Sequence, residues 1–198
     1  YDLKGIPCHK PDDPTAQINF RNLTFNNPYW ATENNFFGEK SQRFFGNAYL
    51  DYKTDFNSSA HNLDLKYQIG VDAYTTLYTD QFGYGSKGTE GEIDEISLTN
   101  NQLNQLITAN YAWAINDNWN LSALLGNEIV YGQNTMLDAY GNVFCFSGWN
   151  HLNNVESYSA GKSYGRNLTF GTFGEIAADY KSMLFLNATF RSDYVSSM

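Results

Sequence analysis

Positively charged residues are scarce in this chain. Lys and Arg number 12 against 21 Asp and Glu in 198 residues, so the formal net charge is −9 at pH 7. Binding to nucleic-acid phosphates needs a basic stripe or patch, and the sequence contains none. A nucleic-acid partner is therefore not expected.

Cysteine is almost absent, since the chain has only Cys8 and Cys145. Two cysteines do not make a disulfide framework, and whether these two pair stays open. A Cys₂His₂ site built from them with His9 and His151 would match no known zinc-ligand spacing. We therefore expect no metal or other cofactor. The acidic end of the Gly-rich segment 81–92 could attract Ca²⁺, although it fits no EF-hand pattern.

Long apolar runs are also missing. No run of about 18 apolar residues exists, so the sequence predicts no transmembrane helix. No residues resemble an activated nucleophile or an acid–base pair, so an enzyme is not expected and no residue is assigned a catalytic role. The chain starts at Tyr1 without an initiator Met or a signal peptide and ends at Met198 within a strand-like pattern. We expect a segment of a longer protein.

The sequence is instead rich in aromatic residues, at 17%, and in uncharged polar residues. Asn, Gly, Thr and Tyr are poor helix formers, and they take the place of charge. Between Asn62 and Tyr78, apolar and polar residues alternate for the whole stretch. A typical strand has about 5–6 residues, so this alternation is unusually long.

Six segments alternate in this way, and the connections between them alternate in length. Transmembrane β-barrels have short periplasmic turns and long extracellular loops, and a spanning strand needs about 9–11 residues. The pattern predicts an all-β fold: a segment of an antiparallel up-and-down transmembrane β-barrel with about six long strands. The expected strands are 43–53, 62–78, 102–115, 120–131, 168–180 and 184 onward. The expected short turns are 54–61, 116–119 and 181–183. The expected long loops are the region before residue 42, 79–95 and 132–166.

Aromatic residues lie where the two membrane interfaces would be. Tyr52, Trp119 and Tyr180 are near the short turns, and Tyr131 and Phe170 are near the long loops. Tyr and Trp favour that depth because the ring is apolar and its polar atom is hydrated. A large soluble β-sandwich or β-helix that buries its apolar face stays open as the alternative.

Short motifs spread across 27–197 resemble the barrel of SusC-type (RagA-type) TonB-dependent transporters of the Bacteroidetes outer membrane. Their order and spacing carry the resemblance more than any one of them does. The motifs are Asn27-Pro28-Tyr29-Trp30, Arg43-Phe44-Phe45-Gly46-Asn47, Leu50-Asp51-Tyr52-Lys53, Leu65-Lys66-Tyr67, Gly70-Val71-Asp72-Ala73-Tyr74, 106–111, 120–121, 125–128, 173–174, 179–181 and 186–194.

The resemblance implies import of a glycan or a peptide across the outer membrane of a Gram-negative cell, by a multi-pass barrel of about 22 strands around a plug. It also implies energy supplied through TonB and a SusD-like surface lipoprotein that covers the extracellular mouth. Residues 1–198 would be an incomplete part of this one barrel domain. The plug, the TonB-contacting N-terminal part and the remaining strands would lie outside it.

Two alternatives remain. One is a small non-transporting outer-membrane barrel that serves as an anchor or adhesin, which would have to pair its own edge strands. The other is a secreted, soluble β-sheet protein that binds glycan, which would cover its apolar face with a second sheet.

The long loop 132–166 is the candidate for contact with a ligand or with the lid lipoprotein. Exposed rings beside amides suit sugar recognition, and they equally suit a protein interface or packing of the loop on itself. The loop residues are Phe146, Trp149, Asn150, His151, Tyr158 and Tyr164.

Charged residues on the polar strand faces are expected to face the lumen. Cross-strand pairing explains them structurally, and a lining of the substrate path is the functional interpretation. These residues are Arg43, Asp51, Asp64, Lys66, Asp72, Glu128, Glu175, Arg191 and Asp193.

Overall fold

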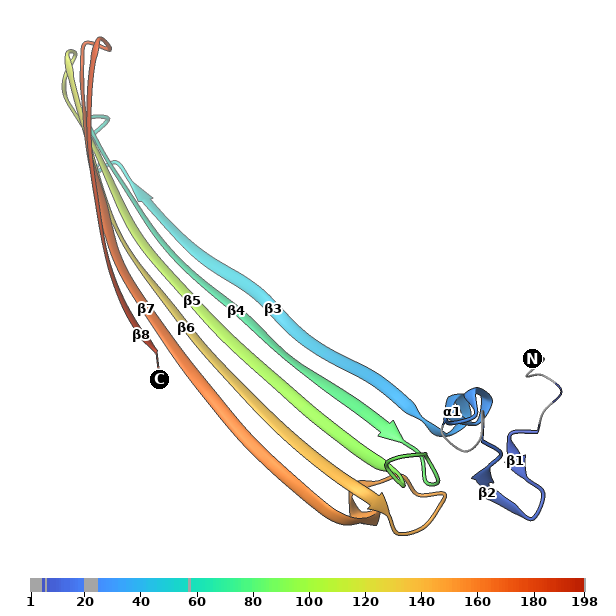
Figure 1. Cartoon of the computed structure of the whole chain (residues 1–198). Coiled ribbons are helices and arrows are strands. Elements are labelled where there is room, and N and C mark those ends of the chain that lie inside the picture. Colours follow the sequence, from blue (N-terminus) through green and yellow to red (C-terminus); the bar gives the residue numbers. More distant parts are fainter. Residues whose placement is uncertain (1–4, 6, 20–24, 57, 198) are drawn as a thin grey trace. The chain divides into compact units, whose positions relative to one another are not determined.

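The computed structural model describes residues 5, 7–19, 25–56 and 58–197, and it is almost entirely β-structure (Figure 1). Two small strands and a short helix precede six long strands. The elements are β1 (His9–Lys10), β2 (Asp13–Gln17), α1 (Pro28–Asn34), β3 (Phe36–Thr54), β4 (His61–Phe82), β5 (Glu92–Asn116), β6 (Trp119–Phe144), the 3₁₀ helix η2 (Leu152–Asn154), β7 (Val155–Tyr180) and β8 (Leu184–Ser197).

The six long strands form one antiparallel sheet in the order β3-β4-β5-β6-β7-β8, so each strand lies beside its neighbour in sequence (Figure 1). Strands β7 and β8 pair without a register shift, from Asn167 opposite Ser197 to Tyr180 opposite Leu184. All six predicted strands and all three predicted short turns are confirmed. This order is that of an up-and-down barrel segment.

The strands are longer than the sequence pattern predicts. Strand β6 continues to Phe144 and β7 begins at Val155, so the predicted long loop 132–166 is wrong in extent and shrinks to 145–154. The predicted loop 79–95 shrinks to 83–91 for the same reason. In these stretches both faces of the strands carry polar residues, so apolar and polar residues no longer alternate in the sequence. The backbone hydrogen bonds between neighbouring strands nevertheless continue.

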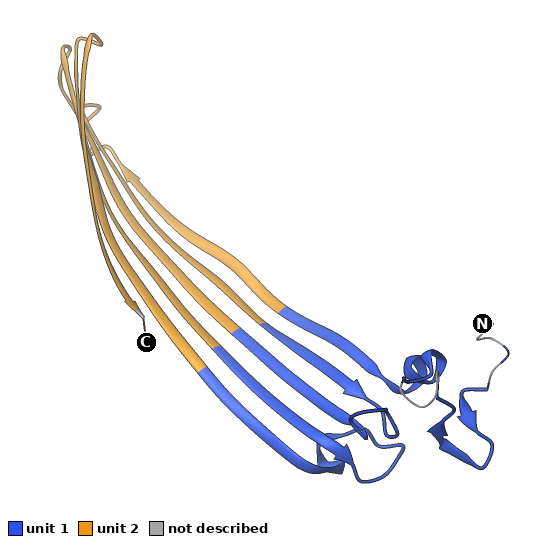
Figure 2. Cartoon of the chain, viewed as in Figure 1, with its two compact units in different colours: residues 1–42, 75–99, 135–163 blue, residues 43–74, 100–134, 164–198 orange. Residues whose placement is uncertain are grey.

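The chain divides into two compact units, coloured separately in Figure 2. The second unit comprises 43–74, 100–134 and 164–198. One face of its sheet is apolar and uncovered: the relative exposure of Leu50 is 74%, that of Ile176 62% and that of Leu186 59%. Its other face carries charged and amide side chains that bond across strands.

The first unit comprises 1–42, 75–99 and 135–163. Its buried apolar side chains are Trp30, Ile93 and Phe144. Helix α1 starts with Pro28, and the Asn27 side chain caps it by accepting a hydrogen bond from the Tyr29 backbone N–H, which matches the usual preferences at a helix start. Among the described helices, none has the length and apolar character to cross a membrane.

Gly91 in the first unit cannot be replaced without strain, because of its backbone angle and because of the neighbouring Phe144 ring. Gly91 has a φ of +92°, and a Cβ atom there would collide with the Phe144 ring. Only glycine adopts that conformation without strain. The close approach lets Phe144 pack over the backbone at the start of β5.

Candidate functional site

Three aromatic side chains stack on one another in the loop 145–154. The ring centroids of Phe146 and Trp149 are 6.0 Å apart, and those of Trp149 and His151 are 5.1 Å apart with nearly parallel planes. Phe146 is 53% exposed and Trp149 45% exposed. We call these three residues the aromatic ledge. It offers a flat, amphipathic surface for a ring or an apolar side chain of another molecule.

A single buried amide holds the loop in shape. Asn154 is 1% exposed, and its Nδ2 donates hydrogen bonds to the carbonyl oxygens of Phe146 at 2.8 Å and Trp149 at 2.7 Å. The Asn154 carbonyl also accepts from the Cys145 N–H at 2.8 Å. The aromatic ledge is therefore positioned by the loop backbone before any ligand arrives.

Asn154→Ala is expected to release the aromatic ledge. The substitution leaves two loop carbonyls without their donor, which costs about 1–3 kcal/mol for each buried group. Hydrogen exchange of the amides in 145–154 should accelerate by at least about tenfold, since about 1.4 kcal/mol corresponds to that factor. Asn153→Ala is the matched control because its side chain is exposed, and unchanged exchange in both variants would contradict this account.

The other three predicted loop residues are not part of this stack. Asn150 is in the same loop, but Tyr158 and Tyr164 belong to β7, so their placement in a loop is wrong. Both rings are exposed, Tyr158 by 79% and Tyr164 by 69%. The structure therefore brings three of the six predicted contact residues into one surface, and their role in binding remains a prediction.

Most of the predicted lumen residues form pairs on the polar face of the second unit, and these pairs join different strands except for Arg191 with Asp193, which both lie in β8. Arg43 donates from Nε to Asp72 Oδ1 at 2.8 Å, and Arg191 lies 2.9 Å from both Glu128 and Asp193. On this face Lys53 also forms an ion pair with Asp64 at 3.0 Å, and the Asn187 amide donates a hydrogen bond to Glu175 at 2.7 Å. The Lys66 ammonium lies over the Tyr49 ring, and Asp51 is exposed in β3.

The same polar face has a hollow of about 680 Å³ whose lining includes five amide side chains. Gly70 lies in it, with the Cβ atoms of Asn47 and Asn104 each 3.9 Å from the position a Gly70 Cβ would take. Arg43 and Glu128 also line it. Amides both donate and accept hydrogen bonds, so this wall suits hydroxyl groups and peptide groups alike.

Carboxylates gather at the start of β5 in the first unit. Burial raises the pKa of Asp94, and the negative charges of Asp80, Asp138 and Glu92 raise it further. The Tyr140 hydroxyl donates to Glu92 at 2.7 Å, and this hydrogen bond raises the pKa of Tyr140. Asp94 and Tyr140 therefore hold their protons more tightly than isolated side chains do.

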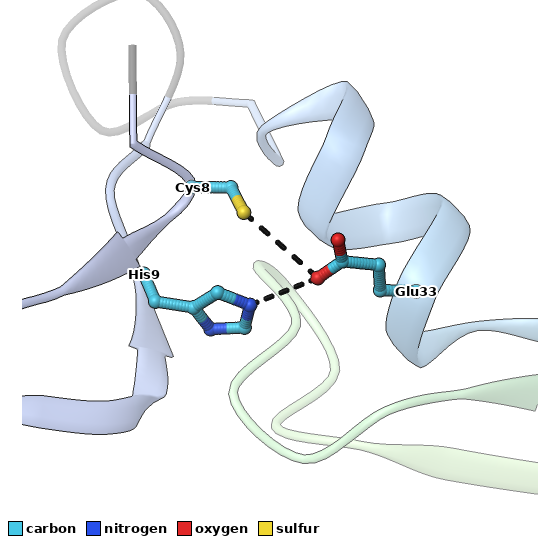
Figure 3. A group of neighbouring side chains, drawn as sticks. All are labelled: Cys8, His9 and Glu33. Atoms are coloured by element: carbon cyan, nitrogen blue, oxygen red, sulfur yellow. Dashed lines mark hydrogen bonds and ion pairs between the residues drawn. The ribbon is translucent and has the colours of Figure 1, made fainter.

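Within the described part of the chain, one group of side chains has the make-up of a metal site. Cys8, His9 and Glu33 place a sulfur, a nitrogen and an oxygen within 4.8 Å of one another (Figure 3). His9 hydrogen-bonds Glu33, which raises the pKa of His9. Cys145 and His151, which a Cys₂His₂ site would also need, are not members of the group. Cys8 and Cys145 are free thiols.

Sequence reasoning missed Glu33 and Asn154. Glu33 lies in α1, 24 residues from His9, and no spacing rule links the two positions. Asn154 is one of several Asn residues in its loop, and only burial distinguishes it. The start of α1 did carry a signal, since Asn followed by Pro is typical of a helix N-terminus.

The described fold is an antiparallel up-and-down barrel segment, and its likeness to solved structures agrees. Neither a protein-family model nor a curated protein sequence matches the chain. The RagAB peptide importer in its closed-closed state matches with a TM-score of 0.70 and 19% identity, over 86% of this chain and 19% of that one. The RagAB peptide transporter matches with a TM-score of 0.67 and 19% identity, over 92% and 21%.

The importer in its open-open state matches with a TM-score of 0.66 and 18% identity, over 94% of this chain and 21% of that one. The chain thus spans about a fifth of the length of these chains. At such identity the likeness shows the fold alone.

Proposed function

We propose that this chain is part of the barrel of a SusC-like, TonB-dependent transporter that imports nutrients across an outer membrane. The observation that carries the proposal is the sheet itself. It has an uncovered apolar face, a polar face paired across strands, and turns that alternate between short and long. The fold match to the RagAB peptide importer supports this role.

The residues next to the short turns are those that would cross the membrane. A crossing takes about 9–11 residues, and β6 has 26, so each long strand continues beyond the bilayer. Near the turns, the Trp119 and Tyr180 rings lie 4.6 Å apart and His61 stacks on Trp113 at 5.7 Å. Such rings favour the interface between lipid and water.

The edges of the sheet support a larger barrel. Strands β3 and β8 each have one neighbour in the described sheet, and an unpaired edge in lipid would cost several kcal/mol for each exposed backbone group. The proposal supplies the missing neighbours from further strands of the same barrel, with residues 1–198 as one part of it. A plug would face the polar wall, and TonB would contact the N-terminal part of the transporter.

The aromatic ledge is proposed to contact the substrate or a SusD-like surface lipoprotein at the extracellular side. Its stacked, exposed rings have the character of residues that dominate protein interfaces and sugar sites. The transporter would be a multi-pass protein of a Gram-negative outer membrane and not an enzyme. Peptide is the substrate class to test first because the matched structures are of a peptide importer, and glycan is the second.

The two alternatives fit the structure less well. A small anchor barrel would pair its own edges, whereas β3 and β8 are the edges of the described sheet. A soluble glycan binder would cover its apolar face, whereas Leu50 and Ile176 are largely exposed.

The first test is the intact mass of the native polypeptide, extracted from its membrane in detergent without proteolysis. This 22.5 kDa chain spans about a fifth of the matched importers, so a barrel of about 22 strands with a plug predicts about 100 kDa. Cells that lack the protein should also lose uptake of labelled peptides or labelled oligosaccharides, and the complementing gene should restore it. A native mass near 22.5 kDa would refute the transporter proposal.

A further inference from the structure

Three different ligand atoms converge between the β1 strand and helix α1. His9 Nε2 lies 2.9 Å from Glu33 Oε2, and Cys8 Sγ lies 3.9 Å from the same oxygen. Figure 3 shows the thiol and the imidazole both directed at the Glu33 carboxylate. Two adjacent residues of one segment thus meet a third from an element 24 positions further along the chain.

The His9 ring is oriented by a backbone carbonyl. Nδ1 lies 2.8 Å from the Pro14 carbonyl oxygen, which can only accept a hydrogen bond, so Nδ1 carries a proton. Without a metal, a protonated Nε2 donates to the Glu33 carboxylate at 2.9 Å. A metal ion would take the place of that proton, because a ring nitrogen binds a metal only in its unprotonated form. A carbonyl that holds the second ring nitrogen is also the usual outer-shell partner of a metal-binding histidine.

We propose that Cys8, His9 and Glu33 bind a divalent transition metal ion, with Zn²⁺ as the best fit. Zinc binds thiolate, imidazole and carboxylate ligands together, and three protein ligands leave a fourth position for water. Ca²⁺ and Mg²⁺ require oxygen ligands and do not suit a site with sulfur and nitrogen.

The distances from Glu33 Oε2 to the other two ligand atoms are close to those of a zinc site. Zinc bond lengths of about 2.0–2.3 Å in a tetrahedron place neighbouring ligand atoms about 3.3–3.5 Å apart. The observed separations of 2.9 and 3.9 Å bracket that value. The His9 and Glu33 side chains are 37% and 58% exposed, so both can shift and the ion can enter from solvent.

The ion would join the β1–β2 hairpin to helix α1. Without it, the link is an exposed ion pair, which contributes little to stability. Helix α1 also carries Trp30, a fully buried side chain of the first unit. A bound metal would therefore stabilise the segment ahead of β3, a role that goes beyond nutrient import and does not depend on it.

The first experiment uses the full-length native protein in detergent, stripped with a chelator and titrated with Zn²⁺ or with Co²⁺ as a spectroscopic probe. We expect a thiolate-to-Co²⁺ charge-transfer band. We also expect one Zn²⁺ ion per chain whose binding requires Cys8, His9 and Glu33. Cys8→Ser and His9→Gln should each weaken this binding by at least tenfold, because loss of outer-shell partners alone costs about 10–100-fold. Cys145→Ser, which removes the other free thiol, should change nothing.

A second experiment needs no variant, so misfolding cannot obscure it. Both thiols of the wild-type protein are alkylated with and without Zn²⁺, and the modified peptides are quantified by mass spectrometry. The metal should slow alkylation of Cys8 by at least tenfold and leave Cys145 unaffected, since a coordinated thiolate is less reactive than a free one. Equal protection of both thiols, or protection of neither, would overturn the proposed site.

Discussion

Ile176→Arg is expected to lower the free energy of unfolding of the membrane-inserted protein by about 2–4 kcal/mol, the cost of an arginine near the bilayer midplane on the lipid face of a barrel. Ile176 lies opposite Ala188 of β8 and is 62% exposed on the apolar face. It is four positions from Tyr180, the last residue of β7, which places it well inside the apolar band. Urea-induced unfolding of the full-length protein in lipid bilayers measures the change.

The neighbouring substitution Ala177→Arg is the matched control. Ala177 lies opposite Asn187, and strand alternation puts its side chain on the polar face. The same charge, one residue away, should therefore cost much less. Equal losses from the two variants would mean that neither face meets lipid, and the barrel interpretation would fail.

Most of the sheet could be predicted because one of its faces is apolar and the other is polar. That contrast repeats with a period of two in every strand near the short turns, and it also places Arg43 and Asp72 on one face. It cannot show which residues pair, because a pair depends on the register between strands. Arg43 meets Asp72 because of the register between β3 and β4, and Arg191 meets Glu128 because of the registers that link β6, β7 and β8.

The far parts of the strands could not be predicted because their two faces have similar polarity. From 132 to 144 and from 155 to 166, polar residues occupy both faces, so the pattern resembles that of a loop. The pattern therefore predicts Tyr158 and Tyr164 in a loop, although they lie in β7. Backbone hydrogen bonds to the neighbouring strands stabilise these stretches of strand. Such bonds do not depend on a side-chain pattern, so a single sequence does not reveal them directly.

The residues that build local sites were the least predictable. Aromatic side chains near Trp149 suggested a binding surface, yet only the structure shows that the Asn154 amide orders it. Glu33 joins Cys8 and His9 because α1 folds back beside β1, and the sequence around α1 has no periodic pattern. Contacts between distant residues depend on tertiary packing, which local spacing does not encode.

Trp30→Ala is expected to have the second large effect, in the first unit. Trp30 is 0% exposed, and its indole packs beside Gly85, where an added Cβ would lie 3.7 Å from Cζ2. Removing a buried tryptophan costs about 3–5 kcal/mol, so helix α1 should separate from the 83–91 loop. Hydrogen exchange of the full-length protein should show the α1 and 83–91 amides exchanging at least about a hundredfold faster, the factor that about 2.7 kcal/mol represents.

Tyr29→Ala is the control for this prediction, because Tyr29 belongs to the same helix but is 40% exposed. Both variants replace one aromatic side chain of the same helix with alanine, and the two positions differ in burial. The Trp30 variant should leave exchange near the short turn 117–118 unchanged, since that turn lies in the second unit. If both variants exchange alike around α1, Trp30 does not hold the helix against the loop, and the first unit must be stabilised by its hydrogen bonds instead, such as those from Gln17 to Asn26 and Gly85.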